Sequence, residues 1–93
     1  MKYIKVQWNN EFPEGPILIY SEIDNEQWEH RKIEVFRHER QGYADKTEEV
    51  GGSFLGIEPW PDLTKLGTEP EFEISEISAD EFEQLWARRG KQR

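Results

Sequence analysis

The sequence contains no cysteine, which excludes disulfide bonds and thiolate metal ligands. It has no run approaching the ~20 consecutive apolar residues of a membrane-crossing helix. The N-terminal residues MKYIKVQW lack the apolar core of about 7–15 residues that marks a secretory signal. These absences lead us to expect a cytoplasmic protein with no membrane association.

Basic residues are scarce in one long stretch of the chain. Residues 48–86 contain 11 acidic residues and a single basic residue, Lys65, and the whole chain has a net charge of −8. The basic residues that close the sequence, Arg88, Arg89, Lys91 and Arg93, are too few to offset this excess. Because affinity for nucleic acid comes chiefly from Lys and Arg on phosphates, direct nucleic-acid binding is not expected. An acidic block instead attracts a basic partner.

Recognisable catalytic and metal-binding motifs are also missing. There is no phosphate-binding loop, no dinucleotide fingerprint and no G-x-S-x-G elbow. His30 and His38 are eight residues apart, which is no familiar ligand spacing. Ser53 follows two glycines as in an oxyanion loop, but an ordinary loop explains it better. We therefore expect a protein that is not an enzyme and that carries no metal or cofactor.

Aromatic side chains are expected to make up much of the hydrophobic core. The chain of 93 residues has the length of one domain, residues 1–93, and only 34% of it is hydrophobic. Aromatic residues make up 13% of the sequence, and each buries roughly 150–250 Å² when it enters a core. This composition predicts a folded domain with a small core.

The first half of the chain alternates apolar and polar residues with the period of a β-strand. Residues 3–8, 17–23 and 28–36 form three such segments, and residues 43–44 begin a fourth. The connections are too short for crossover helices, so the pattern predicts an antiparallel meander. Gly42 is expected to supply positive φ in the reversal before the fourth strand.

The second half is less regular and ends in a helix. Pro59-Trp60-Pro61 cannot form a central strand, Asp62 can cap a helical turn over residues 63–66, and residues 72–74 suit an edge strand. Ser78 and Glu81 form a capping box for a last helix, which Gly90 ends. Phe82, Leu85 and Trp86 give that helix one apolar stripe, while Arg88 and Arg89 complement its C-terminal end. The prediction is an α+β fold, in which the helix packs on an antiparallel sheet of four to five strands.

The acidic block has two interpretations. It can serve solubility alone, or it can be a surface for a basic partner. Trp60 is either a central anchor of that surface or a side chain that folds back onto the open sheet face. The candidate partner-binding residues are Glu48, Glu49, Glu58, Trp60, Asp62, Glu69, Glu71 and Glu73.

Several stretches together resemble a family of small uncharacterised bacterial proteins that is described only as a domain of unknown function. They are residues 1–6, 18–24, 28–36, 42–44, 55–59 and 77–86. The resemblance covers nearly the whole chain, and it implies no activity and no catalytic residues. In size, charge and class, but in no motif, the chain is also similar to immunity proteins of bacterial toxin systems.

We interpret the chain as a non-enzymatic binding protein, most specifically an immunity protein or antitoxin that occludes a basic, nuclease-type toxin. The alternative is a small ligand-binding or enzymatic domain with a pocket on the sheet face. Tyr43, Trp28, His30 and Arg31 would line that pocket. A regulatory subunit of unknown partner is a third possibility.

Overall fold

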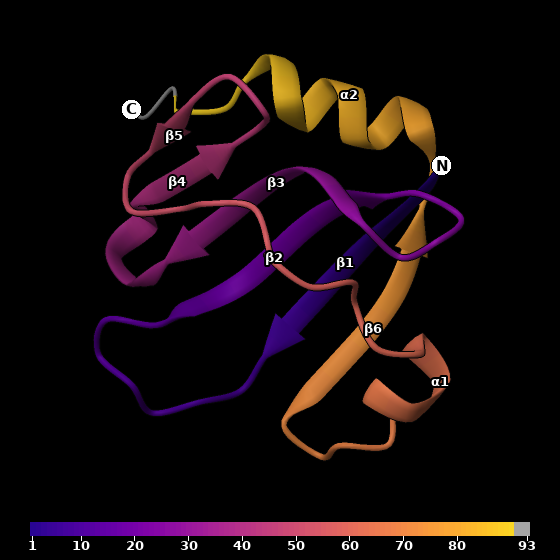
Figure 1. Cartoon of the computed structure of the whole chain (residues 1–93). Coiled ribbons are helices and arrows are strands. Elements are labelled where there is room, and N and C mark those ends of the chain that lie inside the picture. The colour runs from indigo at the N-terminus through magenta and orange to yellow at the C-terminus, as the bar shows by residue number, and fades with distance from the viewer. Residues whose placement is uncertain (91–93) are drawn as a thin grey trace.

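The computed structural model describes residues 1–90, so Lys91 and Arg93 of the basic tail lie outside the described residues. Residues 1–90 form an antiparallel sheet of six strands in the order β5-β4-β3-β2-β1-β6, together with the helices α1 and α2 (Figure 1). The strands are β1 (Lys2–Trp8), β2 (Pro16–Ile23), β3 (Glu29–Phe36), β4 (Gln41–Ala44), β5 (Glu49–Val50) and β6 (Phe72–Ile77). The helices are α1 (Leu63–Leu66), α2 (Ala79–Ala87) and a 3-10 turn, η1 (Arg37–Glu39).

The predicted α+β fold and antiparallel meander are confirmed, but the sheet has more strands than expected. β1 to β4 are neighbours in chain order. β5 adds a further strand at one edge of the sheet. It has only two residues, which are too few to show the apolar–polar alternation that identifies a strand in the sequence. β6 returns to pair with β1, with Tyr3 opposite Ile77, and so completes the other edge.

The turn between β3 and β4 differs from the expectation for Gly42. His38 and Glu39 take the positive φ angles, 65° and 64°, whereas Gly42 lies within β4. A Cβ atom at Gly42 would lie 2.4 Å from Ser53 Oγ and 2.9 Å from the Val50 carbonyl oxygen. Gly42 is therefore required because residues 50–53 pack closely against it, and not because the turn between β3 and β4 needs a positive φ angle.

Helix α2 packs on one face of the sheet, which we call the helix face. The Ser78 hydroxyl accepts a hydrogen bond from the Glu81 N–H at 3.0 Å, as the predicted cap requires. Phe82 is fully buried, and its ring centroid lies 5.2 Å from that of Tyr3 on β1. The helix ends at Ala87, three positions before the expected stop, and Gly90 takes φ 72° beyond it.

Residues 51–62, the crossing segment, run over the opposite face of the sheet from β5 to α1, which lies beside β6 (Figure 1). Beneath the segment and α1, Ile4, Val6 and Ile23 form a buried cluster, and Trp60 and Leu63 pack against it. The Asp62 carboxylate caps α1 by accepting from the Thr64 N–H at 2.9 Å, as predicted. No helix within residues 1–90 combines the length and the apolar character needed to cross a membrane.

Candidate functional site

A buried carboxylate on β3 holds the crossing segment against the sheet. The Glu29 side chain is only 1% exposed, and it accepts hydrogen bonds from the Gly56 N–H at 2.9 Å and from the Trp60 indole Nε1 at 3.3 Å. From the sheet, the Ser21 hydroxyl donates to the same carboxylate at 2.6 Å, and Lys32 Nζ lies 3.2 Å from it. A buried carboxylate is tolerated only when it is paired and hydrogen-bonded in this way. Glu29 therefore holds the crossing segment in place and also orients Ser21 and Lys32 on the sheet.

A second carboxylate repeats this arrangement at the start of the crossing segment. The Ser53 hydroxyl donates to Glu34 Oε1 at 2.5 Å, and Lys32 Nζ lies 3.9 Å from Glu34 Oε2. Ser21 and Ser53 are almost completely buried, and each hydroxyl donates to a carboxylate. The Ser53 contact ties the crossing segment to the sheet, whereas the Ser21 contact joins β2 to β3.

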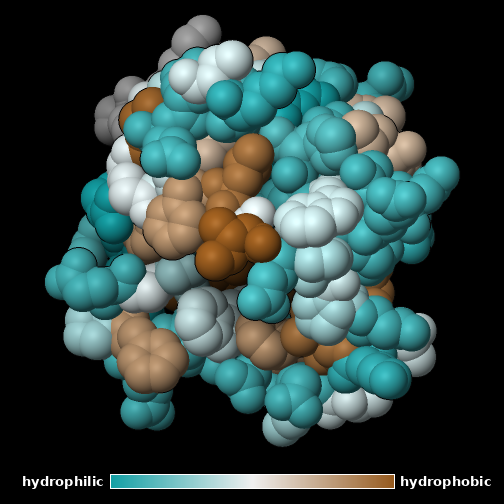
Figure 2. Space-filling model, in the orientation of Figure 1, coloured by the Kyte–Doolittle hydropathy of each residue, from teal (hydrophilic) through white to brown (hydrophobic). Residues whose placement is uncertain are grey.

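The outer side of the crossing segment presents large apolar side chains to solvent. Phe54 is 60% exposed and Ile57 is 85% exposed. Figure 2 shows hydrophobic residues gathered near the centre of this face, with hydrophilic residues around them. A contiguous exposed apolar patch with a polar rim is characteristic of a protein-binding surface.

Trp60 itself takes the second of the two predicted positions. It folds back onto the sheet, packs against the core cluster and donates to Glu29. Its backbone N–H also donates to the Gln27 carbonyl oxygen at 2.8 Å. Phe54 and Ile57, rather than Trp60, are therefore the apolar side chains that the segment offers to a partner.

The predicted acidic residues are divided among several places. Glu58 and Asp62 are exposed on the crossing segment. Glu49 lies opposite Ala44 at the β5 edge, whereas the neighbouring Glu48 lies 3.7 Å from Arg89 near the C-terminal end of α2. The remaining three lie at the opposite edge of the sheet, before or on β6: Glu69, Glu71 and Glu73. The seven acidic residues thus do not form one face, and among them Glu58 directly follows the exposed Ile57 in the sequence.

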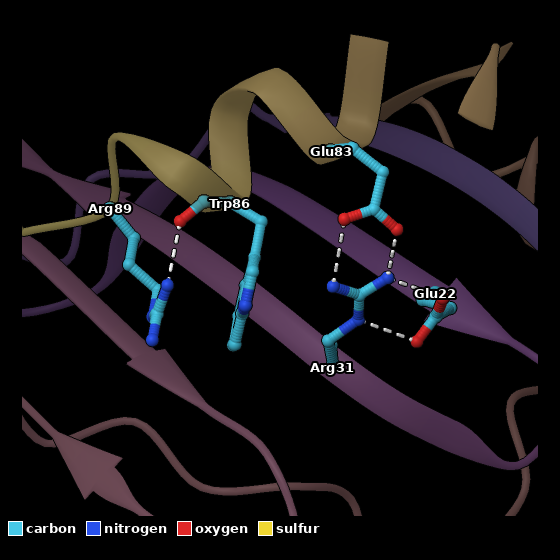
Figure 3. Close-up of polar contacts among 5 residues, drawn as sticks. All are labelled: Glu22, Arg31, Glu83, Trp86 and Arg89. Carbon is cyan, nitrogen blue, oxygen red and sulfur yellow. Dashed lines mark hydrogen bonds and ion pairs between the residues drawn. The ribbon is translucent and has the colours of Figure 1, made fainter. Parts of the chain in front are cut away.

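On the helix face, an arginine is held by two carboxylates and the ring of Trp86 (Figure 3). Arg31 makes paired hydrogen bonds to Glu22, at 2.7 and 2.8 Å, and to Glu83, at 2.6 and 3.1 Å. The Trp86 ring lies between the guanidinium groups of Arg31 and Arg89, with centroid distances of 5.1 and 4.2 Å. These contacts attach α2 to the sheet.

The same contacts shift the pKa values of the acids. Hydrogen bonds from Arg31 lower the pKa of both Glu22 and Glu83, because they stabilise the ionised carboxylates. The pKa of Arg31 is raised by the same two partners. The cluster is therefore a structural ion-pair network that is charged at neutral pH.

The alternative pocket is not assembled from its four predicted residues. Arg31 and Tyr43 contact side chains of α2, Trp28 is 41% exposed, and His30 hydrogen-bonds Asp24 at 2.8 Å in the turn before β3. A surface hollow of about 480 Å³ lies elsewhere and includes Lys5, Trp8 and Arg37 in its lining. No three His, Asp or Glu side chains within residues 1–90 are grouped as metal ligands would be.

The residues that position the crossing segment were missed by the sequence reasoning. One signal was available: Ser21 is in phase with Ile19 and Ile23 on β2, so a polar residue occupies a core position. A hydroxyl at such a position needs a buried partner. The identity of that partner, Glu29, depends on the register between β2 and β3.

The chain belongs to the family described as a domain of unknown function, DUF6881, which it matches over residues 2–91. This confirms the resemblance to an uncharacterised family and adds no activity to it, whereas the match says nothing of a bacterial origin or of similarity to immunity proteins. A search of curated proteins and a search of solved structures each found no match.

Proposed function

We propose that this DUF6881 domain is a non-enzymatic binding protein for a basic protein partner, and that it acts as an immunity protein or antitoxin toward a nuclease-type toxin. One observation carries the proposal. The crossing segment is held by the buried carboxylate of Glu29 and the partly buried carboxylate of Glu34, and on its outer side it exposes Phe54 and Ile57 beside Glu58.

The apolar pair supplies the free energy of association. Burying a Phe or Ile side chain fully contributes roughly 1.5–3 kcal/mol relative to leaving it in water. The segment is tied to Glu29 at Gly56 and Trp60, with Pro59 and Pro61 restricting its backbone. Little conformational entropy is lost on binding when a loop is already ordered in this way.

The carboxylates supply selectivity for a basic partner. Glu58 and Asp62 on the segment are exposed, and the chain as a whole carries a net charge of −8. Lys and Arg side chains that hold substrate phosphates in a nuclease are complementary to such a surface. Association should accordingly be fast at low salt and slower as the ionic strength rises.

The test is affinity capture from lysate of the source organism with the wild-type protein, followed by titration of the purified partner with the wild type and its variants. The wild type should retain a basic protein, and less of it after a high-salt wash. The variant Phe54→Ser/Ile57→Ser should bind that purified protein at least about 30-fold more weakly, the equivalent of roughly 2 kcal/mol. Co-expression should then protect cells from the captured protein.

Matched charge reversals locate the surface. Glu58→Lys/Asp62→Lys and Glu11→Lys/Glu14→Lys change the net charge equally, and all four residues are exposed. Only the first pair should slow association and weaken its salt dependence. Equal effects from both pairs, or unchanged affinity of the apolar variant, would show that the crossing segment is not the binding surface.

A further inference from the structure

The outer edge of β6 has backbone groups that pair with no other backbone group among residues 1–90. Asn9 N donates to Glu71 O at 2.8 Å, which fixes the pattern of bonded pairs along β1 and β6. Because bonded pairs recur at every second residue of an antiparallel ladder, Ile74 and Glu76 direct their N–H and C=O groups away from β1. Within residues 1–90 these four groups have no backbone partner. An open edge of this kind is a template for another strand.

A groove lies beside this edge. Helix α1 and the turn after it form one wall, and β1 and β6 form the other, around a volume of about 360 Å³. Ile4, Leu63 and Ile74 give the groove an apolar lining, and Glu76 also borders it. A groove between a helix and an open strand edge can receive alternate side chains of an added strand.

The two faces of β6 differ in chemistry. Phe72, Ile74 and Glu76 point toward the face covered by α1, whereas Glu71 and Glu73 point toward the helix face. A strand paired with β6 would place one set of its side chains in the apolar groove and the other set beside Glu71 and Glu73. The second set should therefore be basic.

We infer that the β6 edge binds an extended segment of a basic protein in which Lys or Arg alternates with apolar residues. The inference rests on the proposed function and adds a second contact for the same basic partner, at the β6 edge of the sheet. A second copy of this chain is a poorer occupant, because pairing β6 with β6 would bring Glu71, Glu73 and Glu76 of both copies together. The backbone bonds supply affinity, and the alternation supplies specificity.

The experiment uses a synthetic seven-residue peptide of alternating Lys and Val with blocked termini. Addition of the peptide should slow hydrogen exchange of the Ile74 and Glu76 amides. The amides of Glu73 and Ser75, which already face β1, should change little and serve as internal controls. An alternating Glu and Val peptide should not bind. The double variant Glu71→Lys/Glu73→Lys should bind the Lys and Val peptide at least about tenfold more weakly than the wild type does at low salt.

Two N-methylated peptides test the strand pairing without altering the protein. One carries N-methyl groups on its valines and the other on its lysines. Because the N–H groups of alternate residues point to the same edge of a strand, each peptide can donate backbone hydrogen bonds along only one of its two edges. Only one of them should lose affinity, since only one edge of the added strand faces β6. In the protein, Glu76→Pro should abolish binding whereas Glu76→Gln retains it, provided that both unfold at temperatures near that of the wild type. Equal affinity, or equal loss, for the two methylated peptides would overturn the inference.

The outcomes separate this inference from the proposed function. Phe54→Ser/Ile57→Ser leaves β6 unchanged and should bind the peptide as the wild type does. Capture of a basic partner through the crossing segment, without any effect of the peptide at β6, would overturn the strand pairing alone. A dimer in solution whose Ile74 and Glu76 amides are protected without peptide would show a second copy as the occupant and would also overturn it.

Discussion

Trp60 Nε1 donates a hydrogen bond to the Glu29 carboxylate at 3.3 Å, and this contact joins the crossing segment to the centre of the sheet. Glu29→Gln should lower the free energy of unfolding by about 3 kcal/mol, because it leaves Lys32 with less charge compensation and weakens four contacts at once. Urea denaturation followed by tryptophan fluorescence measures the change. Glu58→Gln, an exposed change on the same segment, should stay within about 0.5 kcal/mol of wild type.

The network around Arg31 predicts a loss of stability in acid. The pKa values of Glu22 and Glu83 are lowered in the folded protein, so their contribution is complete above the unfolded-state pKa of about 4.3. It is lost as the pH falls through the lower folded-state values, because protons then bind the unfolded state first. Urea midpoints at pH 7, 5, 4 and 3 should fall more steeply for wild type than for Arg31→Met. Parallel curves for the two proteins would contradict the assignment.

Phe82 determines how α2 is attached. Its side chain is fully buried between the helix and the sheet, so Phe82→Ala should destabilise the protein by about 3–5 kcal/mol. Thermal unfolding by circular dichroism provides the measurement. Gln84→Ala lies on the exposed side of the same helix and should shift stability by less than about 0.5 kcal/mol. A similar effect of both substitutions would contradict the conclusion that burial of Phe82 holds α2 on the sheet.

Two glycines near the crossing segment should respond differently to alanine. A Cβ at Gly42 collides with Ser53 Oγ and the Val50 carbonyl oxygen, so Gly42→Ala should cost about 1–3 kcal/mol. At Gly56 the nearest atoms lie 3.5 and 3.6 Å from a Cβ, an ordinary contact, so Gly56→Ala should be nearly neutral. Denaturant midpoints of the two variants decide this, and a costly Gly56→Ala with a silent Gly42→Ala would refute it.

Local features of the chain were readable from the sequence. Alternation predicted β1 to β3, and the side chains of Asp62 and Ser78 predicted the starts of α1 and α2, because capping involves residues close in sequence. Features that depend on distant pairing were not readable. The burial of Glu29 requires the β2–β3 register, and the exposure of Ile57 requires the path of residues 51–62 over the sheet. The acidic block was visible as a composition, but only the sheet order reveals that Glu49 on β5 and Glu73 on β6 lie at opposite edges.

The position of β6 beside β1 has a consequence for how the chain folds. β1 to β4 pair with their neighbours in sequence, so their loops close at small entropic cost, whereas Tyr3 meets Ile77 only after most of the chain has been brought together. Non-local pairing of this kind is slow. One edge of β1 therefore stays unpaired until β6 has been synthesised and has paired with it. The rate of that pairing determines how long the exposed edge of a nascent chain can associate with other chains.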